Sequence, residues 1–200
     1  TDCALGKKYS ALAIARGLQE RGLDVTFRAT GQTGIMISGS GMPIDAVVAD
    51  FVAGAAEMLS PSASPEHIDV IEGQGSLFHP SYAGVSTGLL HGAQADVLVM
   101  CHEPGRPHMR GLPNFQLPPI DVCIEANLQV ARLTNPAVRM GGIALNTSKM
   151  PRAEAERLCA ETSQRHGLPC TDPFAMGVDA LLDRIIACPA PFRSRSTISA

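Results

Sequence analysis

The chain starts with a turn of small residues that runs into two lysines. Residues 1–8 read TDCALGKK, and a helical pattern of apolar residues follows at once. Backbone N–H groups in such a turn can point at one anion, a lysine ammonium group can reach that anion, and the positive end of the helix adds to the attraction. We therefore expect phosphate to bind here, held by Cys3, Ala4, Leu5, Gly6, Lys7 and Lys8.

Two features of common phosphate-binding loops are missing from residues 1–8. The opening glycine and the hydrophobic strand that carries it would precede Thr1, so we expect the chain to be a fragment without its N-terminal strand. Lys8 stands where a Ser or Thr hydroxyl usually holds the magnesium of a bound nucleotide. The pattern thus favours phosphate binding over nucleotide hydrolysis, and a chance Gly-Lys pair before a helix is the alternative interpretation.

A second group of polar residues follows a short apolar strand predicted at 68–71. Glu72 and Gln74 stand in the run EGQG, whose glycines let the backbone approach a ligand. In phosphate-binding α/β folds, an acid at the tip of a strand holds a metal ion or orients water. His79 comes next and could transfer a proton near neutral pH, although packing, or capping of the following helix, explains it at least as well.

Three further candidates lie between these two groups. The strand predicted at 24–30 ends in a turn at 31–34, which would point Gln32 and Thr33 into a site. Asp50 lies on a helix predicted at 44–59. A solvated helix carboxylate is the more ordinary interpretation of Asp50, and a role in the site is the alternative.

The second half of the chain adds one candidate ligand contact. Asn146 follows a strand predicted at 138–145, and its amide could read a purine edge because it both donates and accepts hydrogen bonds. His102, Glu103 and His108 stand among prolines and a glycine with no second ligand pair at helical spacing, so we predict a loop near the site and no metal. The six cysteines form no CxxC pair, which favours reduced thiols over a zinc site.

Strand and helix patterns must position these residues, and they alternate along the chain. Strands are predicted at 24–30, 68–71, 96–101 and 138–145, and helices at 11–21, 44–59, 85–92, 120–133, 152–166 and 177–187. Such alternation, with polar residues at successive strand tips, predicts a doubly wound, mostly parallel sheet in a three-layer α/β/α fold like that of P-loop NTPases. We expect one domain at 1–187 and a flexible tail at 188–200.

Composition narrows the class of protein. The 200 residues are 45% hydrophobic and 18% charged, with a net charge of −3, as in an ordinary globular domain. The mildly acidic balance argues against nucleic acid as a partner. Because no stretch has the length of a membrane span and no signal peptide opens the chain, we expect a cytoplasmic protein. With no Trp and two Tyr, we do not expect aromatic stacking to hold a ligand.

Several motifs resemble known families. TDCALGK and EGQG resemble the corresponding loops of dethiobiotin synthetase. A longer set of motifs in the same order resembles the D-glutamate N-acetyltransferase family, long catalogued as a domain of unknown function: ATGQTGIMI, DAVVADFVAGAAE, EGQGSLFHP, GLLHG, CHEP and GIALNT. Members of that family usually carry a further N-terminal domain ahead of the loop. The family pattern is not followed in the stretch FAMG at 174–177 or in the tail at 188–200.

The second resemblance implies transfer of an acetyl group from acetyl-CoA to the amine of D-glutamate or a similar amino acid. Under this reading the loop lysines bind phosphates of CoA and Asn146 meets its adenine. Acetyl transfer needs a base and donors to the oxyanion. Glu72 or Asp50 is the expected base, with His79 next, and the expected donors are Gln32, Thr33 and Gln74.

Two alternatives remain open from the sequence. A ligase or kinase-like enzyme resembling dethiobiotin synthetase would use ATP with Mg, held by Glu72 and Asp50. A nucleotide-binding module without catalysis would not need the missing loop hydroxyl. In each case we expect a small-molecule ligand, a homo-oligomer, and neither nucleic acid nor a membrane as partner.

Overall fold

Parallel strands form the centre of the molecule. In the computed structural model, residues 1–187 are described, and the tail predicted at 188–200 lies outside them. Strand β1 (Val25–Arg28) pairs with β2 (Ile68–Ile71), while β3 (Val97–His102), β6 (Arg139–Leu145) and β7 (Cys170–Thr171) pair in the order β3-β6-β7. All of these pairings are parallel.

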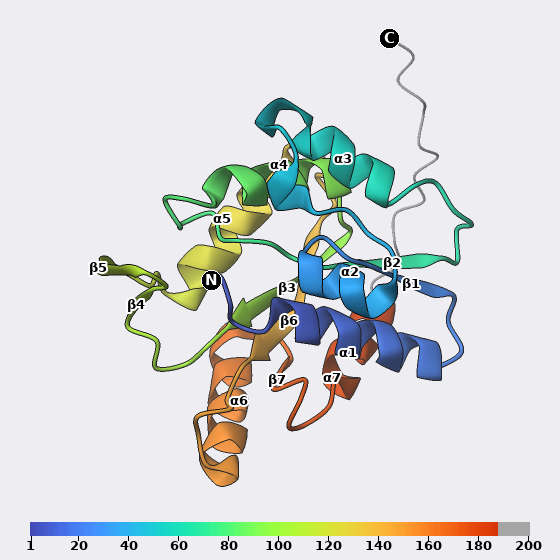
Figure 1. The fold of residues 1–200 in the computed structure, drawn as a ribbon. Coiled ribbons are helices and arrows are strands. Elements are labelled where there is room, and N and C mark those ends of the chain that lie inside the picture. Colours follow the sequence, from blue (N-terminus) through green and yellow to red (C-terminus); the bar gives the residue numbers. More distant parts are fainter. Residues whose placement is uncertain (188–200) are drawn as a thin grey trace.

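Helices cover both faces of these strands. Helices α1 (Lys7–Glu20) and α7 (Asp179–Ile186) pack together on one face. Helices α4 (Ala83–Ala93) and α5 (Ile120–Arg132) contact one another on the opposite face, where α5 packs on β3 and β6, and α6 (Arg152–His166) lies beside β7 (Figure 1). The predicted three-layer α/β/α architecture is therefore confirmed.

The two strand groups share a core. Val70 of β2 and Val99 of β3 both pack against one cluster, which is formed by residues of α1 and α7 and by Val25 of β1. Between the groups runs the start of the chain: the Thr1 nitrogen donates to the Cys101 carbonyl at 2.8 Å, and Ser76 Oγ donates to the Thr1 carbonyl at 2.8 Å. The loop that leads into α1 thus begins in the middle of the fold.

The helix predicted at 44–59 is wrong as a single element. The structure has two 3-10 turns, η1 (Ile44–Ala46) and η2 (Ala49–Phe51), before α3 (Val52–Leu59). Val47 and Val48 between the turns have extended backbones, with ψ of 139° and 135°. Branching at Cβ makes valine a poor helix former, and burial of Ile44 holds the irregular segment against α3 and α4.

The turn predicted at 31–34 is also different, because a helix starts there. Helix α2 (Gln32–Ser38) follows Gly31 directly. The backbone N–H groups of Thr30 and Gly31 donate to the Glu72 carboxylate, which supplies the acceptor that this helix start needs. Glu72 lies 42 and 41 residues from Thr30 and Gly31 in the sequence, so no local sequence pattern predicts these stabilising contacts.

Two short pairings lie outside the predicted strands and helices. Strands β4 (His108–Met109) and β5 (Leu112–Gln116) form an antiparallel hairpin, and β7 lies between the helices predicted at 152–166 and 177–187. The other predicted strands, and the helices from α4 onward, agree with the structure to within two residues at each end. Among the described residues, no helix combines the length and apolar composition needed to cross a bilayer.

Candidate functional site

The loop before α1 has an unusual backbone. Ala4 has a φ of 50° and Gly6 a φ of 109°, both in the left-handed region. Such a conformation costs a residue with a Cβ, such as Ala4, on the order of 1–2 kcal/mol. Left-handed residues in a turn direct successive N–H groups to one side and create a concave anion site. The strained backbone therefore supports the predicted phosphate-binding loop.

Asp2 and Arg106 fix the shape of this loop. The fully buried Asp2 carboxylate accepts hydrogen bonds from Arg106 at 2.8 Å, from the Arg110 N–H at 2.9 Å and from the Cys3 N–H at 2.7 Å. Arg106 also donates to the carbonyls of Cys3 and Ala4 at 2.8 and 3.0 Å. Because the Cys3 N–H faces Asp2, the loop donors open to a ligand start at residue 4.

The pKa of Asp2 reports how strongly it is held. Burial by itself raises the pKa of Asp2, but hydrogen bonds from Arg106, Arg110 and Cys3 lower it by more than burial raises it. The pKa of Asp2 therefore lies below the ordinary value for Asp. Asp2 is therefore ionised at neutral pH and its charge is satisfied by Arg106. Arg106 was not predicted from the sequence, which indicated only a loop near the site.

A second ion pair extends this network. The buried carboxylate of Glu103 accepts from Lys149 Nζ at 2.6 Å and from Arg106. Burial raises the pKa of Glu103, but the hydrogen bonds from Lys149 and Arg106 lower it below the ordinary value. The two negative charges of Asp2 and Glu103 balance the two positive charges of Arg106 and Lys149 in this network. The positive charges of Lys7 and Lys8 are therefore left to attract an anion.

The two loop lysines lie differently. Lys7 is partly buried, and its Nζ donates to the Asp2 carbonyl at 2.6 Å. Its side chain also passes the EGQG run at 72–75, since a Cβ built on Gly73 would lie 3.3 Å from Lys7 Cδ. Burial lowers the pKa of Lys7 below its ordinary value. Lys8 Nζ instead lies 4.6 Å from the ring centre of Tyr9, so Lys7 is the lysine directed to the loop.

Asn146 is brought to the same loop, as predicted from its place at a strand tip. Its backbone N–H donates to the His102 carbonyl at 2.8 Å, and its side-chain oxygen accepts from the Ser148 N–H at 3.2 Å. The side-chain nitrogen lies 3.9 Å from a Cβ built on Gly6. An amide therefore stands beside the loop, where it could contact a bound ligand.

Glu72 is buried at the tip of β2. Its Oε2 accepts the Thr30 and Gly31 N–H groups at 3.1 and 3.2 Å, and Thr30 Oγ1 donates to its carbonyl at 2.7 Å. Gln74 Nε2 donates to Thr30 Oγ1 at 3.0 Å. Glu72 thus connects the end of β2 to the start of α2. The next residue, Gly73, is the one that the Lys7 side chain passes.

The packing interpretation fits His79 best. Its Nδ1 accepts the Ser81 N–H at 3.2 Å, so Nε2 carries the proton and donates to the Arg110 carbonyl at 3.2 Å. The ring is buried, with its centre 4.4 Å from that of Tyr82. Possible metal-ligand atoms of His79, Asp2 and Cys3 lie within 4.8 Å of one another. The His79 nitrogens and the Asp2 carboxylate already have partners, so this donor set does not suit a cation.

The remaining candidates are exposed. Gln32 and Thr33 lie on the first turn of α2, close in sequence to the Glu72 contacts. Asp50 lies on η2, which packs against α3 and α4. The structure therefore places Asn146 beside the loop and brings Lys7 past Gly73, which stands between Glu72 and Gln74 in the sequence. Asp50 is instead on the element that packs against α3 and α4.

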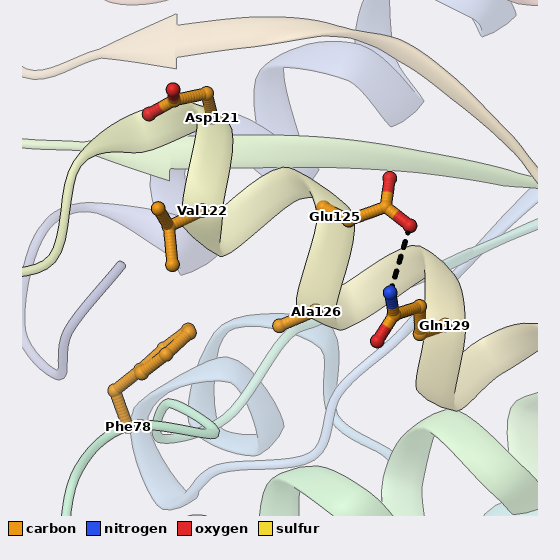
Figure 2. Close-up of a pocket in the computed structure, with 6 residues that line it drawn as sticks. All are labelled: Phe78, Asp121, Val122, Glu125, Ala126 and Gln129. Atoms are coloured by element: carbon orange, nitrogen blue, oxygen red, sulfur yellow. Dashed lines mark hydrogen bonds between the residues drawn. The ribbon is translucent and has the colours of Figure 1, made fainter.

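A cavity of about 610 Å³ lies elsewhere, on α5. Figure 2 shows Phe78 facing Val122 and Ala126, with Gln129 donating to Glu125 at 3.0 Å. The carboxylates of Asp121 and Glu125 stand on this wall. Their negative charge would repel phosphate, and the predicted site residues do not line the cavity.

Comparisons with known proteins connect this geometry to a family. A D-glutamate N-acetyltransferase from a Pseudoalteromonas species is 53% identical over 182 residues, which cover 91% of this chain and 55% of that relative. A protein of the same name from Tritonibacter scottomollicae is 48% identical over 187 residues, which cover 94% of this chain and 56% of the relative. The resemblance found in the motifs is confirmed.

A solved structure is similar over the same region. The crystal structure of a DUF1611 family protein from Anabaena variabilis matches with a TM-score of 0.86 and 38% identity, covering 92% of this chain and 54% of that protein. The chain thus spans about half the length of the relatives it matches. A family model described as a domain of unknown function, DUF1611_C, P-loop domain, matches residues 1–182, and the chain belongs to this family.

Proposed function

We propose that the protein containing this chain transfers an acetyl group from acetyl-CoA to the amine of D-glutamate, and that this domain binds the CoA. The observation that carries the proposal is the loop itself: a strained backbone, Lys7 directed along it, and Asn146 beside Gly6. The names of the relatives, both D-glutamate N-acetyltransferases, support the reaction.

The loop chemistry is compatible with CoA. CoA carries a pyrophosphate and a ribose phosphate, which backbone N–H groups from residue 4 onward and the Lys7 ammonium could bind. In this position the ammonium would exchange its hydrogen bond to the Asp2 carbonyl for a charge-assisted one to phosphate. Lys8 offers no hydroxyl for magnesium, and CoA does not need one.

Acetyl transfer requires the acceptor amine to lose a proton. The amine nitrogen attacks the thioester carbonyl, a C–N bond forms, the C–S bond breaks, and the sulfur leaves as a thiolate that takes up a proton. Among the predicted bases, we favour Glu72, because it is buried at the tip of β2 and directly precedes Gly73, the residue that the Lys7 side chain passes. Exposed Asp50 and doubly hydrogen-bonded His79 are less suitable. Gln74, Gln32 and Thr33 remain the proposed oxyanion or substrate donors.

The ATP- and magnesium-dependent alternative has weaker support. It needs two carboxylates on one cation, and Asp50 is exposed on η2, which packs against α3 and α4. A homo-oligomer, a cytoplasmic location and the absence of nucleic-acid or membrane partners remain predictions from the sequence.

Calorimetry on the complete protein tests the ligand. We expect CoA to bind without added metal, and Lys7→Ala to weaken CoA binding by about 1.5–3 kcal/mol through loss of a charge-assisted phosphate contact. Lys8→Ala is the matched control, because its ammonium lies over Tyr9, and it should have the smaller effect. An acetylation assay with D- and L-glutamate tests the acceptor. Tighter, metal-dependent ATP binding with ATP turnover would contradict the proposal.

A further inference from the structure

One aromatic side chain stands almost fully in solvent on an ordered loop. Phe174 is 92% exposed, the most exposed of the large hydrophobic residues described. It lies between β7 and α7, in the stretch that departs from the family pattern. An exposed apolar residue alone needs no explanation. What distinguishes this one is how its backbone is held and what it is held to.

Hydrogen bonds fix the backbone on both sides of Phe174. The Asp172 carboxylate accepts the N–H groups of Phe174 and Ala175 at 2.9 and 3.0 Å. The Met176 N–H donates to the Asp172 carbonyl at 2.8 Å, and Arg152 donates to the Ala175 carbonyl. The loop is therefore ordered in advance, so a ligand that covered the ring would need to immobilise little backbone.

The same carboxylate ties the loop to the candidate ligand site. The second oxygen of Asp172 accepts the Thr147 N–H at 2.8 Å and the Thr147 hydroxyl at 2.6 Å. Thr147 directly follows Asn146, whose amide lies beside Gly6 of the phosphate-binding loop. The Asp172 carboxylate thus links the backbone of Phe174 to Thr147, the residue next to Asn146, which lies beside the phosphate-binding loop.

We propose that Phe174 forms a stacking platform for the purine base of the ligand whose phosphates bind at the loop, with Asn146 at the edge of that base. This proposal rests on the proposed function and adds a specificity-determining residue to it. A base has an apolar face that an aromatic ring can cover, whereas the Asn146 amide can only make hydrogen bonds to its edge. The inference departs from our sequence-based expectation that stacking is unimportant, since one positioned ring is sufficient.

Three ligands test the contact with the base: CoA, ATP, and 4′-phosphopantetheine, which keeps one phosphate of CoA and lacks the 3′-phospho-AMP part that carries the base. On the complete protein, we expect Phe174→Ala to weaken CoA binding by about 5- to 150-fold, the range measured for loss of one stacked base. Binding of 4′-phosphopantetheine should not change. Phe115→Ala removes another exposed Phe, on β5, and serves as the matched control with unchanged CoA binding.

A second variant gives a direct signal. Phe174→Trp keeps the stacking surface, so CoA affinity should be retained. This chain has no Trp of its own, so the change in fluorescence relative to the unmodified protein reports on position 174. The added Trp signal should change with CoA and not with 4′-phosphopantetheine.

The outcomes separate this proposal from the proposed function. If CoA binds and Phe174→Ala binds it equally well, the stacking proposal is wrong and the CoA proposal stands. Equal weakening of CoA and 4′-phosphopantetheine would show a general disturbance of the loop and overturn stacking. If only ATP binds, and Phe174→Ala weakens it, the base contact stands and the acetyl-CoA proposal fails. If Phe174→Ala changes the oligomeric mass and leaves ligand affinity unchanged, Phe174 is a contact between copies and the stacking proposal is wrong. If none of the three ligands binds, both the stacking proposal and the CoA proposal are wrong.

Discussion

Asp2, in the loop before α1, and Glu72, at the end of β2, are two buried carboxylates that are held in different ways. Asp2 forms an ion pair with Arg106 and also accepts backbone N–H groups. Glu72 accepts the backbone N–H groups of Thr30 and Gly31, and it has no ion pair with any residue at 1–187. Both are about equally inaccessible, with exposed fractions of 0% and 5%.

The difference separates a structural acid from a candidate base. A carboxylate paired with arginine gains little from taking up a proton, because protonation would leave the guanidinium without that partner. A carboxylate held only by neutral donors can accept a proton without stranding a cation. Burial does not distinguish the two residues, whereas the charge of their partners does.

Neutralising Asp2 should have the largest effect, and it should fall on stability. Asp2→Asn keeps the size of the side chain but breaks the ion pair with Arg106. Removing one member of a buried pair typically costs 3–5 kcal/mol, and we expect about 3 kcal/mol because Arg106 keeps Glu103 as a partner. Denaturant unfolding of the complete protein measures this change. Unaltered stability would mean that the loop is not held by this pair.

Neutralising Glu72 should instead reduce turnover. In Glu72→Gln, the amide oxygen can still accept the Thr30 and Gly31 N–H groups, so the melting temperature should change little. Loss of a general base should lower kcat by roughly 100-fold or more, equivalent to about 2.7 kcal/mol. Acetyl transfer from acetyl-CoA to D-glutamate, normalised to folded protein, is the measurement. A lower melting temperature with normal turnover would make Glu72 a structural residue like Asp2.

The parts of the fold that follow local rules could be predicted from the sequence. The apolar run of β3 and the periodic pattern of α6 were placed to within two residues, because periodicity and length are local signals. The approach of Asn146 to Gly6 was also accessible, since parallel strands bring their tips to one edge of the sheet.

What the sequence could not supply depends on contacts between distant segments. Arg106 contacts Asp2 across 104 positions, and a single arginine in a loop rich in proline and glycine carries no signal of that contact. The start of α2 depends on Glu72 in the same way. At 44–59 the apolar spacing suggested a helix, but the Val47-Val48 pair remains extended while Ile44 is buried.

The smallest expected effect tests whether the Glu72 carboxylate must sit close to α2. A Cβ built on Gly34 would lie 2.3 Å from Glu72 Oε2, so Gly34→Ala must displace either the carboxylate or the helix. We expect it to cost about 1–3 kcal/mol of stability, the usual penalty for overpacking, together with a loss of turnover if Glu72 is the base. Gly54→Ala on α3 is the matched control, because nothing lies within 4 Å of its built Cβ. That variant should gain about 0.5–1 kcal/mol from the better helix propensity of Ala. Equal stability changes in the two variants would show that Glu72 has room to move. Close packing of Glu72 against α2 would then not explain how it differs from Asp2.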